Sequence, residues 1–198
     1  MANYLLQKKF LFPMGWSKSV ATGKPVQKNG NELPWFTYAF IAFLEKRIHS
    51  EMSVFEYGSG NSTLWFNKKG CTLVSVEHDE NWYRQMQPRL DSTPKIEYLW
   101  RDLESKAYAQ EILNYSKVFD IIVLDGRDRV NCCLNALNAL KADGVIIWDN
   151  SDREEYLAGY QFLESNNFKR LDFHGLGPIN SGKWCTSVFY REDNCLNI

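Results

Sequence analysis

Residues 53–63 read Ser53-Val54-Phe55-Glu56-Tyr57-Gly58-Ser59-Gly60-Asn61-Ser62-Thr63. The apolar first half predicts a buried strand, and Gly58 and Gly60 predict a tight turn that leads into a helix. Glycine lacks a Cβ, so the turn can adopt positive φ and a ligand can approach its backbone, where the first N–H groups of the helix are free. The stretch is typical of a nucleotide-binding loop in an α/β protein.

Three further positions narrow the kind of nucleotide. A dinucleotide fingerprint has a third glycine where this chain has Thr63, and it has no acid two residues before the first glycine, where this chain has Glu56. About twenty residues after the turn, the β-branched run 72–76 ends in Glu77, at the spacing where α/β proteins place an acid for ribose hydroxyls. Such an acid would repel a 2′-phosphate. The alternative is that Glu77 is a solvated acid at a strand end.

The strand-Glu-x-Gly-x-Gly pattern of Glu56, Gly58 and Gly60 resembles motif I of the class I S-adenosylmethionine-dependent methyltransferases. This resemblance implies S-adenosylmethionine as the cofactor, with Glu56 helping to hold its methionine end and Glu77 its ribose. Asp102 resembles the family position that receives the adenine amino group, although Arg101 beside it could neutralise it instead. The remaining residues that we expect around the cofactor are Ser59, Asn61, Ser62, His78 and Asp125.

From residue 53 onward, strand-like runs alternate with helical ones, which predicts a parallel sheet with helices on both faces. The later strands are expected at 95–100, 118–124, 144–148, 168–173 and 184–190. Four helices are expected between the strands. The first is capped by Asp79 and runs to Gln87, where Pro88 helps to end it. The others are expected at 104–115, along a face with Leu134, Leu137 and Leu140, and at 152–166. This order resembles the methyltransferase sheet, a Rossmann-like seven-stranded, mostly parallel sheet with a final antiparallel strand.

The chain is expected to fold as one globular domain, since 198 residues fall within the usual range. Residues 50–198 form the methyltransferase-like part. The preceding segment, 1–49, is rich in glycine, proline and aromatic residues and includes an amphipathic helix at 35–47. It is either a lid and brace over the site or a tail packed on the edge of the sheet.

Polar residues close the fourth and fifth strands at Asp125, Asp149 and Asn150, and two carboxylates with an amide oxygen suit Mg²⁺ or a related cation. The arrangement resembles the catechol and caffeoyl-coenzyme A O-methyltransferases, which bind a metal with such residues. Those enzymes carry a lysine three residues after the first ligand, where this chain has Asp128 between two arginines. The alternative is that the acids are hydrogen-bonded strand ends or pair with the arginines.

Methyl transfer depends mainly on alignment of the reactants, because the sulfonium is already activated. A hydroxyl acceptor must still lose its proton. A cation at Asp125 could make this easier, or Asp128 or His174 could accept the proton. His174 is expected in the loop after the sixth strand, although a lone loop histidine is more often only solvated. The loop from His174 to Trp184 is longer than a hairpin needs and is a candidate acceptor lid.

The charge balance gives 23 Lys and Arg against 24 Asp and Glu, a net charge of −1. No bulk charge therefore favours nucleic acid or an anionic membrane, and a small-molecule acceptor is expected. No apolar run is long enough to span a bilayer and the N-terminus does not resemble a signal peptide, so a cytoplasmic location is expected. The five cysteines, without a C-x-x-C pair, are expected to be free thiols.

Taken together, these features predict an S-adenosylmethionine-dependent methyltransferase that carries out an O-methyl transfer to a small molecule. One alternative is a methyltransferase-like domain that binds a nucleoside or a protein partner without transferring a group. The other is an aminopropyltransferase of the spermidine-synthase type, which shares this sheet. Its acidic amine-binding signature is not evident in the sequence.

Overall fold

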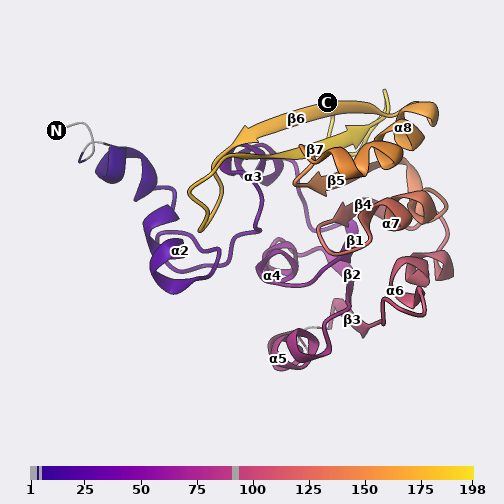
Figure 1. Cartoon of the computed structure of the whole chain (residues 1–198), viewed down its shortest axis with the longest axis horizontal. Coiled ribbons are helices and arrows are strands. Elements are labelled where there is room, and N and C mark those ends of the chain that lie inside the picture. The colour runs from indigo at the N-terminus through magenta and orange to yellow at the C-terminus, as the bar shows by residue number, and fades with distance from the viewer. Residues whose placement is uncertain (1–3, 5, 91–93) are drawn as a thin grey trace.

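The computed structural model describes residue 4, residues 6–90 and residues 94–198. It contains one seven-stranded sheet with the spatial order β3-β2-β1-β4-β5-β7-β6 (Figure 1). The strands are β1 (Ser53–Tyr57), β2 (Thr72–Glu77), β3 (Ile96–Trp100), β4 (Phe119–Leu124), β5 (Leu140–Asp149), β6 (Lys169–Gly175) and β7 (Trp184–Tyr190). The predicted fold class is confirmed.

The strand directions explain where a ligand can bind. β3, β2, β1, β4 and β5 pair in parallel, whereas β7 is antiparallel to both β5 and β6. The chain runs outward from β1 to β3 on one side and then returns to the other side of β1 to form β4. In such sheets the loops at the carboxyl ends of the strands diverge at this reversal and leave a crevice, which here lies beyond β1 and β4.

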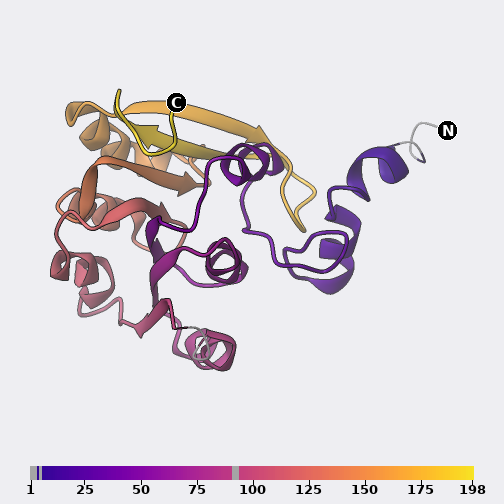
Figure 2. The same ribbon diagram turned by 180° about the vertical axis from the view of Figure 1, so that it is seen from behind.

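Helices cover both faces of the sheet (Figure 2), with α3, α4 and α5 on one face and α6, α7 and α8 on the other. Their bounds are α3 (Tyr38–Glu45), α4 (Asn61–Lys68), α5 (Glu80–Leu90), α6 (Ala107–Gln110), α7 (Arg129–Ala136) and α8 (Leu157–Ser165). Short 3₁₀ turns occur at η2 (Glu111–Asn114) and η3 (Glu154–Tyr156), and the N-terminal segment adds a π-helical turn, η1 (Gln7–Leu11), and α2 (Trp16–Thr22).

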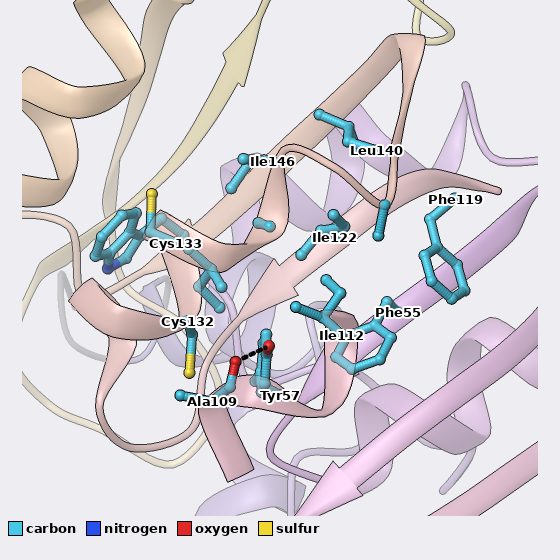
Figure 3. Packing of buried hydrophobic residues seen from close by; sticks show 14 of the residues in the cluster. Phe55, Tyr57, Ala109, Ile112, Phe119, Ile122, Cys132, Cys133, Leu140 and Ile146 are labelled. Carbon is cyan, nitrogen blue, oxygen red and sulfur yellow. Dashed lines mark hydrogen bonds between the residues drawn. The ribbon is translucent and has the colours of Figure 1, made fainter. Parts of the chain in front are cut away.

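Each face of the sheet has its own hydrophobic core because alternate strand residues point to opposite faces. Every residue of β4 is buried, as expected for a strand covered on both sides. Ile122 and Leu124 pack with α6 and α7, and Ile121 and Val123 pack with α3 and α4. In the first of these cores the Tyr57 hydroxyl donates to the carbonyl oxygen of Ala109 at 2.9 Å (Figure 3).

Several predicted boundaries were wrong for local reasons. Leu134, Leu137 and Leu140 do not form the buried face of one helix. Leu134 is exposed, Leu140 already belongs to β5, and α7 instead buries Cys132, Cys133 and Ala136. The small thiol and methyl groups let α7 approach the sheet closely. β5 begins four residues earlier than expected, at Leu140. The expected helix at 104–115 is only the short pair α6 and η2.

The start of α5 was predicted correctly, but its end was not. Asp79 caps the helix, since its Oδ1 accepts a hydrogen bond from the Trp82 backbone N–H at 3.0 Å. The helix continues through Pro88 to Leu90 rather than ending at Gln87. A proline removes one helical N–H and crowds the carbonyl four residues before it, which weakens or kinks a helix without always ending it.

Among the described residues, no helix is both long and apolar enough to cross a membrane. All five cysteines are free, and four of them are buried, which agrees with the expectation of free thiols.

Candidate functional site

A pocket of about 1090 Å³ opens at the carboxyl edge of the sheet, at the reversal of strand order. The turn after β1 forms one wall, the ends of β2, β4 and β5 form the floor, and α5 and the N-terminal segment form the remaining walls. Most of the residues expected around a cofactor or acceptor line it: Gly58, Ser59, Gly60, Asn61, Ser62, Glu77, His78, Asp125, Asp128, Asp149 and Asn150.

The two glycines of the turn serve different purposes. Gly58 has φ of +89°, and a Cβ there would lie 2.9 Å from the Cα of Gly126, so the close approach of two strand ends requires glycine. Gly60 is extended, and a Cβ there would meet no atom within 4 Å. Gly58 therefore shapes the turn, whereas Gly60 leaves open space in front of the first turn of α4.

Glu77 is almost fully buried at the end of β2 and organises the turn around it. Its Oε2 accepts hydrogen bonds from the Ser59 backbone N–H at 3.0 Å and the Ser59 hydroxyl at 2.9 Å. Its Oε1 accepts from the backbone N–H groups of His78 and Asp79 at 2.8 and 2.9 Å. Burial alone would raise its pKa, but the hydrogen bonds from His78, Asp79 and Ser59 lower it overall, so Glu77 is an ionised acceptor.

Glu56 lies behind the turn rather than on the pocket surface and is fully buried. Its Oε2 accepts hydrogen bonds from the hydroxyls of Thr63 and Ser75. Its Oε1 has no hydrogen-bond partner among the described residues. Burial raises the pKa of Glu56 to about 7, although the nearby hydroxyls of Ser62, Thr63 and Ser75 oppose this rise. The residue therefore supplies a buried carboxyl group directly beneath the glycine turn.

This buried carboxyl group should make stability depend on pH. Glu56 has a usual pKa of 4.5 and a folded-state pKa of about 7, so the folded state binds the extra proton between these values. Its contribution to stability is therefore lost as pH rises from about 4.5 through 7. In the parent protein, ionisation of Glu56 should lower the free energy of unfolding by about 3 kcal/mol over this pH range, and Glu56→Gln should not show this loss. Urea denaturation at several pH values measures both profiles. An unchanged pH profile would show that Glu56 ionises normally.

Arg129 joins the ends of β4 and β5 and is itself buried. Its guanidinium donates to the carbonyl oxygens of Gly126 at 2.9 Å, Asp125 at 2.7 Å and Asp149, and it pairs with the Asp125 carboxylate at 3.2 Å. One cation thus satisfies three backbone carbonyls where the loops diverge. The sequence analysis offered arginine pairing only as an alternative to a metal, and the structure shows this pairing for Arg129.

The expected metal ligands all have protein donors. Oδ1 of Asp149 accepts from Trp184 Nε1 at 2.9 Å and from the Thr186 hydroxyl at 2.6 Å. Oδ1 of Asn150 accepts from Arg153 at 3.3 Å. Burial raises the pKa values of both Asp125 and Asp149. The positive charge of Arg129 opposes the rise in the pKa of Asp125. The negative charge of Asp125 raises the pKa of Asp149 further. Two acids therefore lie close together beside one arginine.

Two expected site residues lie elsewhere in the described structure. Asp102 is outside the pocket, where its carboxylate accepts from the backbone N–H groups of Glu104 and Ser105 and shapes the loop after β3. His174 is in β6 rather than in the following loop, directly opposite Cys185 of β7. The hairpin continues two residues further than its turn-forming composition indicated, so His174 belongs to a strand and not to the acceptor loop.

Two walls of the pocket come from outside the predicted cofactor motifs: the N-terminal segment, for which the sequence left open a lid over the site or a tail on the sheet edge, and α5, which was not expected at the site. The N-terminal segment contributes Gly23, Lys24, Pro25 and Trp35, and the Asn61 amide donates to the Pro25 carbonyl at 2.6 Å. α5 contributes Trp82, Gln85, Met86 and Arg89. Spacing within a strand-turn-helix unit gives no indication of residues that reach the site from a distant segment. The exposed tryptophans at 35 and 82 were the available signal.

The loop that was expected to act as an acceptor lid reaches the same pocket. Asn180 and Trp184 line it. The indole N–H of Trp16 donates to the carbonyl oxygen of Asn180 at 2.9 Å, and the Tyr38 N–H donates to the carbonyl oxygen of Leu176 at 2.8 Å. The N-terminal segment and this loop therefore support each other at the pocket rim.

No family model matches the sequence, and no curated protein matches it. The structure is similar to a methyltransferase from Pyrococcus furiosus, with TM-score 0.60 and 15% identity over 96% of this chain and 99% of that one. It is also similar to a Streptococcus mutans protein in complex with SAH (S-adenosylhomocysteine), with TM-score 0.54 and 10% identity over 75% and 94% of the two chains.

A third similar structure is the spermidine synthase from Thermotoga maritima, with TM-score 0.55 and 16% identity over 76% of this chain and 56% of that one. The chain thus spans little more than half the length of the spermidine synthase. These likenesses establish that the chain has the fold of the class I S-adenosylmethionine-dependent methyltransferases. Because the same fold also occurs in spermidine synthase, the reaction must be argued from the pocket.

Proposed function

We propose that the protein binds S-adenosylmethionine in this pocket and transfers its methyl group to a small-molecule acceptor, with O-methyl transfer as the preferred reaction. The observation that carries the proposal is the open space at Gly60, bounded by the first turn of α4 and by ionised Glu77. This arrangement suits a nucleoside whose ribose hydroxyls face a carboxylate. When bound, the cofactor supplies an activated methyl group on a sulfonium.

Acidic side chains lie beside the glycine turn and suit a cationic group there, whereas the basic residues of the pocket, Lys24, Arg89, Arg127, Arg129 and Arg153, belong to its other walls and to the ends of β4 and β5. Glu56, Glu77 and Asp125 surround the turn, and the unpartnered Oε1 of Glu56 is the buried acceptor closest in sequence to the first glycine. A positive ligand above this turn would favour the ionised form of Glu56. The residues that would hold the cofactor are therefore Glu77 for the ribose and the turn from Gly58 to Ser62 for the methionine end.

The acceptor would lie on the side of the pocket formed by the ends of β4 and β5. Asp128 is exposed there and lines the pocket, so it is placed to accept the proton of an acceptor hydroxyl. Trp184 forms part of the same wall and is itself fixed by its hydrogen bond to Asp149. A fixed aromatic wall favours a planar acceptor.

The donor set favours Arg129 over a divalent cation as the positive charge of this site. Asp149 and Asn150 already accept protein hydrogen bonds, and the guanidinium of Arg129 pairs with Asp125. A divalent cation at these residues would have to approach a buried arginine. We therefore propose that transfer proceeds without a metal. Activity that disappears with a chelator and returns with Mg²⁺ would restore the metal-dependent alternative.

Calorimetric titration with S-adenosylhomocysteine tests the cofactor site. We expect Glu77→Ala to weaken binding by about 1.5–3 kcal/mol, because a charged acceptor of hydrogen bonds is lost. Asp102→Asn is the matched control, since Asp102 lies outside the pocket and should bind like the parent protein. Equal affinity in the parent and Glu77→Ala would show that the nucleoside site is misplaced.

A transfer assay with small-molecule acceptors and a parallel titration with decarboxylated S-adenosylmethionine separate the alternatives. Binding without transfer to any acceptor would favour a non-catalytic binding domain. Preference for the decarboxylated cofactor would favour an aminopropyltransferase, for which the similarity to spermidine synthase is the supporting observation.

A further inference from the structure

The β6–β7 hairpin carries a cluster of three metal-binding side chains that the proposed methyl transfer does not use. Asp172 and His174 come from β6 and Cys185 from β7, and one ligand atom of each lies within 4.8 Å of the other two. His174 is the direct cross-strand partner of Cys185. Asp172 is two residues before His174 and therefore points to the same face of the hairpin.

This cluster lies on the opposite face of β7 from the pocket residues. Trp184 and Thr186 direct their side chains to the Asp149 carboxylate on one face. Cys185 and Ser187 alternate with them and point to the other face. The Ser187 hydroxyl accordingly contacts both the Ser151 hydroxyl and the Asp172 carboxylate. The cluster is therefore separate from the acids of the pocket, although the same strand connects them.

The aspartate is already oriented in the way that metal-binding carboxylates are. Its Oδ1 accepts hydrogen bonds from the Ser187 hydroxyl and from the Arg170 guanidinium. Among the described residues, Oδ2 has no hydrogen-bond partner. Arg170 is held in turn by the carbonyl oxygen of Ser151 at 2.8 Å and by the face of the Tyr160 ring at 4.5 Å. Such outer contacts fix the direction of a ligand and leave one oxygen for the metal. Arg170 is 30% exposed, so solvent screens its repulsion of a cation, whereas Arg129 in the pocket is buried.

Access and ligand type both fit a zinc ion. Asp172 and His174 are on the exposed side and Cys185 is buried, so an ion can enter from solvent and meet a sulfur at the base of the site. Ligand atoms on a tetrahedral zinc lie about 3.5 Å apart, which small side-chain rotations can reach from the observed spacing. One sulfur, one nitrogen and one oxygen are the mixture that zinc accepts, with the fourth position left for water.

We propose that Asp172, His174 and Cys185 form a zinc-binding site on the β6–β7 hairpin. Cys185 binds as a thiolate, so its proton passes to the solvent when the ion binds. The thiolate and the carboxylate balance the two charges of the ion, and Arg170 remains paired with Oδ1 of Asp172. The bound ion would join β6 to β7 and so stiffen the strand that holds Trp184 and Thr186 against Asp149. This proposal does not depend on the methyltransferase proposal.

Cobalt(II) titration of the full chain, without a histidine tag, tests the site. We expect one equivalent of cobalt to give intense visible bands of a tetrahedral site and a near-ultraviolet thiolate-to-cobalt band, both removed by added Zn²⁺. His174→Ala should weaken binding by about 100-fold or more, and because His174 is exposed this variant should keep the fold. Cys185→Ser should remove the thiolate band.

Cys195→Ser is the matched control, because Cys195 is half-buried and contacts the carbonyl oxygen of Asp120 near the start of β4, away from the cluster, so the bands should be unchanged. Circular dichroism of each apo variant checks that the fold is retained. The proposal is overturned if the parent protein gives no thiolate band. It is also overturned if the band persists in Cys185→Ser, or if His174→Ala binds cobalt as tightly as the parent.

Discussion

Replacing Arg129 by alanine should lower the free energy of unfolding by about 3–5 kcal/mol. The buried guanidinium satisfies the carbonyl oxygens of Asp125, Gly126 and Asp149 and pairs with a carboxylate whose pKa burial raises. Its removal would leave these carbonyls without donors and two neighbouring acids without a counter-charge. Urea denaturation at neutral pH measures the loss.

Arg127→Ala is the matched control for this experiment. Arg127 lines the same pocket but is exposed, so its loss should change the free energy of unfolding by no more than about 0.5 kcal/mol. If Arg129→Ala lowered the free energy of unfolding no more than Arg127→Ala does, the contacts by which Arg129 joins the ends of β4 and β5 would contribute nothing to stability. The space beside Asp125 and Asp149 would then be available to another cation.

Replacing Gly58 by valine should abolish the binding of S-adenosylhomocysteine. The residue has φ of +89°, which a β-branched side chain rarely adopts, and its Cβ would lie 2.9 Å from the backbone of Gly126. The turn would have to move away from β4, and the N–H groups that follow it would no longer face the pocket. Calorimetry measures the binding, and circular dichroism reports whether the fold survives.

Gly60→Ala separates the shape of the turn from the space in front of it. A Cβ at this position meets no atom within 4 Å, so we expect the variant to fold like the parent. The methyl group would nevertheless occupy space where the cofactor approaches the backbone, and binding should weaken. Full binding by Gly58→Val, or unchanged affinity in Gly60→Ala, would contradict the placement of the cofactor at this turn.

The strands and the nucleotide turn were predictable because their signals are local. β4 is apolar except for Asp120 and is buried on both faces, and the glycine turn follows β1 directly. Glu77 was also found from spacing alone, since the length of one helix and one strand fixes its distance from the turn. The errors in α7 arose because leucine spacing identifies an apolar stripe but not the small residues that permit close packing.

The parts of the site that sequence reasoning missed depend on contacts between distant segments. α5 reaches the pocket through the tertiary fold, and no local pattern records this; for Trp35 the sequence left open a lid over the site or a tail on the sheet edge. Arg129 could be recognised only as an arginine four residues after Asp125, a spacing that permits pairing but does not reveal the three carbonyls it holds. His174 was misplaced because the boundary between β6 and its loop depends on cross-strand pairing with β7.

The most direct test of the account is calorimetric titration of the full chain with S-adenosylhomocysteine, carried out once with Mg²⁺ and once with a chelator. We expect one ligand to bind per chain with the same affinity under both conditions, and we expect Gly58→Val to show no binding. Absence of binding by the parent protein under both conditions would contradict the central claim that the pocket beyond β1 and β4 is an S-adenosylmethionine site.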